Sequence, residues 1–413
     1  MLLSSKGCFL ASYDIDYYLI DVLFIWYGLS YNKFKRSDVR LFLKFSIIFI
    51  VFMTVRYLFL NNVPQLLFFS DLYFLVKYVL LSFLYCAVLR EEALNYIIKL
   101  TIIGAGVSLF FYGLQLISGN LVFFLGSIIT LSPRSSNPDY SNFIVFTYDR
   151  SQGPRNSGFS WEPGAFGCML NLGLLLYFYT NKFVFNKNVW ILVIAIITTL
   201  STTSYIALVF NLLIYYRANG GKYIKIFLLA VPVIVIAVVK VPFLLSKIMS
   251  SYYEDLAVME KMDSLGAFYH LHGGQLPLNR FGSFIYLYNL FKEKLLWGVS
   301  NAYQDSTPRL TNVNISNGLI DFIAKFGLIG LIFLLYKYAL LLKKLVADNE
   351  LLIYSLLIIV ILSFGEPLLI WQNIIAFLFL YHYTNPVDAD VVDEEQDVVP
   401  QVRNRKLTTQ LNY

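Results

Sequence analysis

The chain has 413 residues, of which 58% are hydrophobic and only 14% are charged. Soluble domains carry roughly 25% charged residues, so this balance excludes a soluble protein and indicates a protein with many membrane spans. The formal net charge of +6 fits the basic cytoplasmic loops of membrane proteins, not nucleic-acid binding. The three cysteines are scattered and the three histidines are few, which predicts neither a disulfide framework nor a metal site.

The apolar runs predict an all-α, polytopic membrane helix bundle, because a helix of about 20 apolar residues crosses the hydrocarbon core of a bilayer. We expect about eleven spans, within a range of about ten to twelve. They are placed at 9–30, 41–60, 67–89, 96–117, 162–180, 188–200, 203–217, 224–243, 318–340, 351–365 and 367–384. Basic loops favour the cytoplasm, and they gather on one side of this arrangement. The stretches 118–161 and 244–317 then form two long external loops, in the periplasm of a Gram-negative cell.

Residues 1–384 are interpreted as one membrane domain. Residues 385–413 are polar, charged and without apolar periodicity, which predicts a disordered cytoplasmic tail. Within the domain, two short apolar runs in 188–217 are interrupted by the hydroxyl-rich stretch 201–204. Neither run crosses a bilayer alone, so we interpret the pair as a V with its tip near the outer surface. The stretch 365–367 resembles a second such tip, and an ordinary tight turn is the alternative for both.

The stretch Arg155–Gly164 joins the first external loop to an apolar run. Arg155 supplies a permanent cation with a fork of donors. Glu162 stands directly before Pro163, and proline is tolerated in the first turn of a helix. The stretch is therefore predicted to place a cation and a carboxylate at the mouth of a membrane helix. A structural role is the alternative, since the helix dipole favours a carboxylate at this position.

A second arginine, Arg280, opens an amphipathic run in the second external loop. Such a helix lies on a membrane surface or roofs a cavity. Two forked cations that converge on one point are what a diphosphate requires. His270, in the same loop, is a candidate general base, and a solvated loop histidine is the alternative. The apolar residues of the run share one helical face: Phe281, Phe284, Ile285, Tyr288 and Phe291.

Charges inside the expected spans are few, and such charges are usually functional or paired. Arg56 and Lys77 are two of them. Asp321 and Lys325 are four residues apart on one expected helix and are predicted to pair with each other. No Walker loop, dinucleotide fingerprint or Ser/His/Asp arrangement stands out. No cofactor, metal or ATP is therefore indicated, and an activated substrate is expected to supply the energy.

Over roughly residues 100–340 the chain resembles the O-antigen polymerases and ligases, a family of multispanning inner-membrane glycosyltransferases. The most specific piece is Arg-x-x-Gly-Phe-x-x-Glu-Pro-Gly within 155–164. Ser316 stands where ligases of this family commonly have a histidine, which favours the polymerases. The other pieces are Leu-Ser-Thr-Thr-Ser-Tyr at 200–205, Arg280 with the later Leu-Trp-Gly-Val-Ser at 296–300, and Ser-Asn-Gly-Leu at 316–319 with Phe-Gly-Leu-Ile-Gly at 326–330.

The resemblance implies a GT-C-like, multi-pass glycosyltransferase of the bacterial inner membrane. It implies transfer of glycan from undecaprenyl diphosphate to a hydroxyl of another lipid-linked repeat unit, without metal or cofactor. Arg155 and Arg280 would bind the diphosphate, and Glu162 first and His270 second would act as base. The expected partners are undecaprenyl diphosphate-linked oligosaccharide, membrane lipids and a chain-length regulator protein, and no nucleic acid. Three further residues are expected to contact the substrate: Ser204, Tyr205 and Asn317.

Two alternative functions remain open at this point. An O-antigen ligase would transfer finished glycan to lipid A-core with the same chemistry. A flippase for lipid-linked oligosaccharides would need substantial charge along a channel through its spans and would have short loops. The few charges within spans and the two long external loops favour the enzyme. A structural membrane protein of an assembly complex is a third, weaker interpretation.

Overall fold

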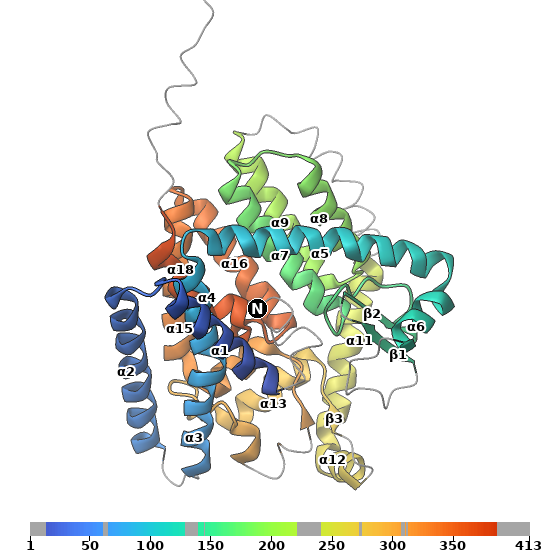
Figure 1. Ribbon diagram of the computed structural model, residues 1–413. Helices are drawn as coiled ribbons and strands as arrows, with labels where there is room; N and C mark the ends of the chain where they lie inside the picture. Colours follow the sequence, from blue (N-terminus) through green and yellow to red (C-terminus); the bar gives the residue numbers. More distant parts are fainter. Residues whose placement is uncertain are drawn as a thin grey trace, which may run out of the picture.

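The computed structural model describes residues 14–60, 65–128, 139–143, 145–220, 241–271, 275–306, 310 and 313–385 (Figure 1). The expected tail after Asn385 and most of the expected span 224–243 lie outside these residues. Helices dominate the described part. Two small sheets accompany them: β1 (Tyr140–Phe143) pairs antiparallel with β2 (Phe146–Asp149), and β3 (Leu276–Pro277) pairs in parallel with β4 (Val313–Asn314).

Among the described residues, four helical stretches are long and apolar enough to cross a membrane. The chain is therefore a mostly helical membrane protein, as its composition predicts, while the count of about eleven spans stays a prediction. The four stretches are α2 (Arg36–Phe59), the continuous α3 (Gln65–Phe74), η2 (Leu75–Leu80) and α4 (Leu81–Leu89), α5 (Glu92–Ile117), and α15 (Gly318–Leu345). Shorter apolar helices are α1 (Asp14–Ser30), α6 (Gly119–Ile128), α8 (Lys187–Thr198) and α16 (Asn349–Gly365).

The centre of the bundle is α7 (Pro163–Thr180), which is buried along almost its whole length. Its sequence is apolar all round, which is the pattern of a helix enclosed by others. Helices α5, α8, α16 and α9 (Thr202–Ala218) pack around it, and α5 crosses the view of Figure 1 while α2 and α3 stand upright at its edge. The buried amide of Asn171 donates to the carbonyls of Gly167 and Ser204, so a polar link fixes α9 against α7.

The first turns of α15 are separated from the rest by a break at Gly327, whose φ of 71° and ψ of 177° are not helical. The break leaves backbone carbonyls without helical partners, and neighbouring segments use them. The N–H of Val299 donates to the carbonyl of Ala324 over 2.7 Å. The side chain of Arg56 donates to the carbonyl of Lys325, also over 2.7 Å.

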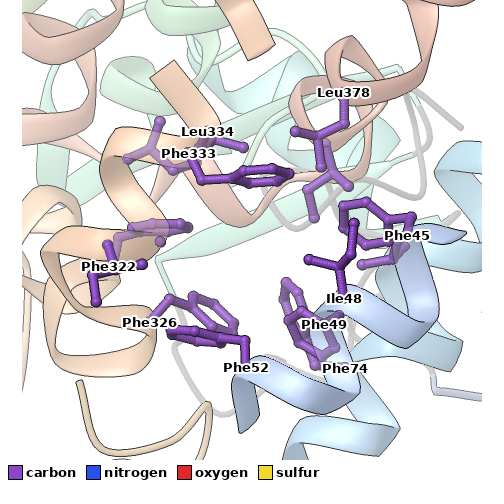
Figure 2. A pocket seen from close by; sticks show the side chains of 15 residues that line it. Phe45, Ile48, Phe49, Phe52, Phe74, Phe322, Phe326, Phe333, Leu334 and Leu378 are labelled. Carbon is purple, nitrogen blue, oxygen red and sulfur yellow. The ribbon is translucent and has the colours of Figure 1, made fainter. Parts of the chain in front are cut away.

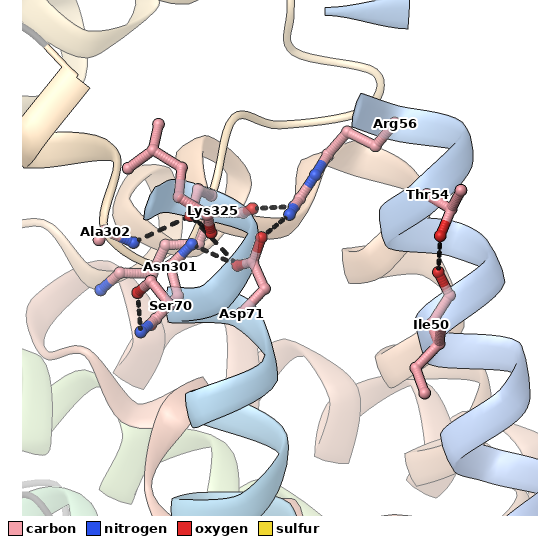
Figure 3. A network of polar contacts seen from close by, with 10 residues as sticks. Ile50, Thr54, Arg56, Ser70, Asp71, Asn301, Ala302 and Lys325 are labelled. Carbon is pink, nitrogen blue, oxygen red and sulfur yellow. Dashed lines mark hydrogen bonds and ion pairs between the residues drawn. The ribbon is translucent and has the colours of Figure 1, made fainter. Parts of the chain in front are cut away.

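Two predictions about charges inside spans are confirmed here. Arg56 forms a buried ion pair with Asp71, which also accepts the N–H of Asn301 (Figure 3). Asp321 and Lys325 pair over 2.6 Å within α15. Both pairs have their hydrogen-bonding partners within the protein, as charges in a membrane helix require.

The prediction of one span over 367–384 is wrong in that these residues do not form a single continuous helix. The chain forms η5 (Leu368–Ile370), α17 (Gln372–Ile375) and α18 (Phe377–Tyr383) instead. Pro367 has no backbone N–H to continue α16, and Trp371 has extended backbone angles of −76° and 140°. Non-helical backbone at membrane depth must be enclosed by protein, and residues 368–380 are buried.

The expected external loops contain more helix than the sequence predicts. The first includes α6, β1, β2 and the short η3 (Arg150–Gln152). The second includes α11 (Val241–Glu260), α12 (Met262–Leu271), α13 (Arg280–Phe291) and η4 (Tyr303–Ser306). The helix predicted to start at Arg280 is confirmed, but its packed face carries Gly282, Ser283, Leu287 and Phe291, while Phe284 and Tyr288 of the predicted apolar face are exposed.

Candidate functional site

Four helix ends meet at one place: the starts of α7, α13 and α15 and the end of α16. Gly164, in the first turn of α7, lies so close to Glu366 that a Cβ atom would be 2.6 Å from its Oε1. Gly318, the first residue of α15, lies against the backbone carbonyl of Glu366 so tightly that a Cβ would overlap it. Glycine permits these approaches, so the Glu-Pro corner after α16 fits directly between two other helix starts.

Arg280 is held at this point by the end of α16. Its Nε donates to the carbonyl of Gly365 over 2.9 Å, and its Nη2 lies 3.3 Å from Oε1 of Glu366. The side chain is 43% exposed, whereas that of Glu366 is 3% exposed. The guanidinium is therefore anchored from behind by a buried carboxyl group and presents its other side to the surroundings.

Arg155 is held by the tip between α8 and α9. Its Nε donates to the carbonyl of Thr199 over 3.1 Å and its Nη2 to that of Leu200 over 3.3 Å. Leu200 has a φ of 50°, a conformation unusual for a branched residue. Burial lowers the pKa of Arg155, Glu162 raises it, and the like charge of Arg280 lowers it. The two arginines of separate loops are thus close enough to interact electrostatically.

Two carboxyl groups complete the cluster. Glu162 occupies the N-cap position of α7, without capping the helix through its side chain, and its carboxyl is hydrogen-bonded to that of Glu366. Burial, followed by the charge of Glu162, holds the pKa of Glu366 well above its usual range, although Arg280 opposes this. Two adjacent carboxyls cannot both ionise cheaply, which is the second cause of the raised pKa of Glu366.

The side chain of Asn317 is linked to the cluster by hydrogen bonds to backbone groups. Its Oδ1 accepts the N–H groups of Leu319 and Ile320 and so caps α15, while its Nδ2 donates to the carbonyl of Arg280 over 3.1 Å. The neighbouring Ser316 donates to the carbonyl of Leu278 over 2.7 Å. Both residues therefore join the start of α15 to the start of α13.

The two hydroxyl residues of the α9 tip differ. Ser204 is fully buried, and it lies directly against Gly167 of α7, so the expectation of a substrate contact at Ser204 does not fit its packing. Tyr205 is half-buried and donates to the carbonyl of Ile197 over 2.7 Å. Its ring lies within the electrostatic range of Arg155, at the edge of the cluster.

The other expected base, His270, belongs to α12, but its side chain lies outside the described part of the chain. Glu366 is the residue of the cluster that the sequence analysis placed only in a turn. A signal for it was present, because Glu366 precedes a proline as Glu162 does. A buried carboxyl whose pKa is strongly raised beside a specific charged partner is typical of functional sites.

Comparison with known proteins leaves the resemblance resting on the sequence motifs alone. Neither a protein-family model, nor a curated protein, nor a solved structure matches the chain. The arrangement places two guanidiniums within electrostatic range of each other, beside two carboxyl groups. Guanidiniums are typical binders of phosphate oxygens, and carboxyl groups are typical acceptors of protons in catalysis.

Proposed function

We propose that the protein is a repeat-unit polymerase of the O-antigen polymerase type, a GT-C-like glycosyltransferase of the bacterial inner membrane. The observation that supports this most strongly is the convergence of Arg155 and Arg280 beside Glu162 and Glu366. The proposed substrate is a glycan carried on undecaprenyl diphosphate. A diphosphate is a good leaving group, so the enzyme needs cations that stabilise negative charge more than it needs an acid.

In the proposed reaction, a hydroxyl of one lipid-linked repeat unit attacks the anomeric carbon of the glycan on a second carrier. The new glycosidic bond forms as the bond between that carbon and the diphosphate oxygen breaks, and both electrons leave with the diphosphate. Arg155 and Arg280 would stabilise the developing charge. Glu162 would accept the proton of the attacking hydroxyl, and Glu366 would hold Arg280 in position.

The test is extension of lipid-linked repeat units by the purified, full-length protein. The proposal predicts longer glycans on undecaprenyl diphosphate without ATP and in the presence of a chelator. A strain without the gene should carry surface glycan with a single repeat unit. Complete loss of attached surface glycan would indicate the ligase instead, and accumulation of lipid-linked units on the cytoplasmic side would indicate a flippase.

A further inference from the structure

A large apolar cavity lies between α2 and α15, away from the charged cluster (Figure 2). Its volume is about 160 Å³. Its walls are hydrocarbon: phenylalanines from α2, α3 and α15 together with aliphatic residues of the broken segment after α16. Ile48 of α2 lines the cavity and is 57% exposed, so the cavity reaches the surface that faces lipid.

The cavity lies between the two fixed ends of α2, where the helix meets the bundle through bulky aromatic side chains such as Phe45 and Phe49. At one end Arg56 pairs with buried Asp71 (Figure 3). At the other end Asp38 pairs with Arg90 over 2.7 Å and accepts the hydroxyl of Tyr383 over 3.2 Å. Between these ends, only 17% of the most apolar 18-residue stretch of α2 is buried inside the protein. Figure 1 shows α2 at the edge of the molecule.

The size and lining of the cavity select a hydrocarbon occupant. Apolar cavities do not take up water, and one of about 150 Å³ in another protein holds benzene. A cavity of this size therefore holds a segment of roughly six carbon atoms. A flexible hydrocarbon chain can enter this cavity from the membrane side, where Ile48 is exposed.

Two chain segments that line the cavity also reach the charged cluster. Leu369, which lines the cavity, follows Glu366 by three residues, and Phe322 follows Gly318 by four, which is about one helical turn. With the basic start of α2 in the cytoplasm, as the sequence predicts, the lining stretch Phe45–Phe52 belongs to the middle and outer half of the span. A chain that descends from a diphosphate at the cluster would therefore meet the cavity.

We propose that this cavity holds the prenyl chain of the lipid-linked substrate while the two arginines hold its diphosphate. The inference rests on the proposed function for the identity of the lipid. It adds that α2 and α15 form the tail site and that recognition extends beyond the diphosphate.

Two matched pairs of variants test the cavity. Ile48→Trp on α2 would fill it, whereas Ile47→Trp changes an equally exposed neighbour that does not line it. On α15, Phe333→Trp changes a half-buried residue that lines the cavity, and Ile332→Trp changes its exposed neighbour, which does not. The full-length protein in phosphatidylethanolamine–phosphatidylglycerol nanodiscs is irradiated with a polyprenyl diphosphate that carries a diazirine on its prenyl chain. Labelled peptides are then identified by mass spectrometry.

We expect labels on the lining residues of α2 and α15 that unlabelled undecaprenyl diphosphate removes. Ile48→Trp and Phe333→Trp should exclude at least two methylene groups of the chain from the cavity and so lower this labelling about tenfold. Ile47→Trp and Ile332→Trp should leave the labelling unchanged. Labels elsewhere, or equal labelling in both members of each pair, would overturn the inference. So would a diazirine phosphatidylethanolamine that labels the cavity and is not displaced by undecaprenyl diphosphate, because ordinary lipid would then be the occupant.

The labelling does not require turnover, so it separates the two proposals. Labelling of the cavity without glycan extension would support the tail site and refute the polymerase. Glycan extension with equal rates for Ile48→Trp and Ile47→Trp, and with labels elsewhere, would support the polymerase and refute the tail site. A carrier with a short prenyl chain that does not reach the cavity should be extended equally by all four variants.

Discussion

At the scale of single residues, the two arginines are where activity should be most sensitive. Replacing Arg155 or Arg280 with Ala should lower the extension rate by about 10²–10³, the usual effect of removing one group that stabilises developing charge. Arg217→Ala is the control, because Arg217 forms an ion pair with Glu350 in which both side chains are 56% exposed, and such pairs contribute little. Normal extension by the Arg280→Ala protein would show that the cluster does not act on the leaving group.

The raised pKa of Glu366 predicts how stability depends on pH. A carboxyl that keeps its proton in the folded state but loses it on unfolding stabilises the protein fully below its unfolded pKa, near 4.5. That contribution is lost as pH rises toward the folded pKa, by up to about 1.4 kcal/mol per pH unit for one proton. Glu366→Gln cannot ionise and should flatten this decline in the thermal unfolding temperature. Glu350→Gln should keep the wild-type slope, and an unchanged slope in Glu366→Gln would contradict the raised pKa of Glu366.

The sequence predicts those contacts of the cluster whose residues lie close together along the chain. Arg155 and Glu162 lie within one short motif, so their joint position follows from it. Arg280 was predictable as a cation at a helix start, but its anchor at Glu366 was not, because 86 residues separate them. The burial of Ser204 depends on a close approach to Gly167, which no pattern in the α9 sequence contains.

At the scale of elements, the contact between α15 and the end of α16 should tolerate no added methyl group. Gly318→Ala would place a Cβ onto the carbonyl of Glu366, and a well-packed site loses about 1–3 kcal/mol when it is overfilled. The thermal unfolding temperature should fall, and extension should fall further because Glu366 holds Arg280. Gly106→Ala is the matched control in α5, where nothing lies within 4 Å of an added Cβ. Equal stability of the two variants would argue against the tight contact.

Helices defined by local signals were predicted better than those defined by packing. The two short runs in 188–217 are α8 and α9, with the predicted turn between them, because a hydroxyl-rich stretch interrupts an apolar pattern. The start of α13 at Arg280 also follows from amphipathic periodicity. The break at Gly327 could not be predicted, since a distant segment stabilises it: the N–H of Leu328, just after the break, bonds to the carbonyl of Leu295.

At the scale of the whole molecule, basic residues also lie at helix ends opposite the cluster. Helices α7 and α15 start at the cluster and α16 ends there, so their other ends lie away from it. At those opposite ends Arg217 of α9 meets Glu350 of α16, and Lys344 of α15 donates to the carbonyl of Tyr381. Lysines and arginines near the ends of membrane helices favour the cytoplasm. Arg217 and Lys344 therefore favour an external position for the cluster, where a lipid-linked glycan would be polymerised.

Labelling of introduced cysteines tests this orientation in intact cells. Lys182, just beyond α7, and Glu293, just beyond α13, are exposed and lie on opposite sides of the predicted topology. In a protein without Cys8, the remaining Cys86 and Cys168 are buried and should not react. A membrane-impermeant maleimide should label Glu293→Cys in intact cells but Lys182→Cys only after permeabilisation. The reverse pattern would put the arginines on the cytoplasmic side, where an external polymerase could not use them. The proposed function would then be refuted, and only the description of a helical membrane protein would remain.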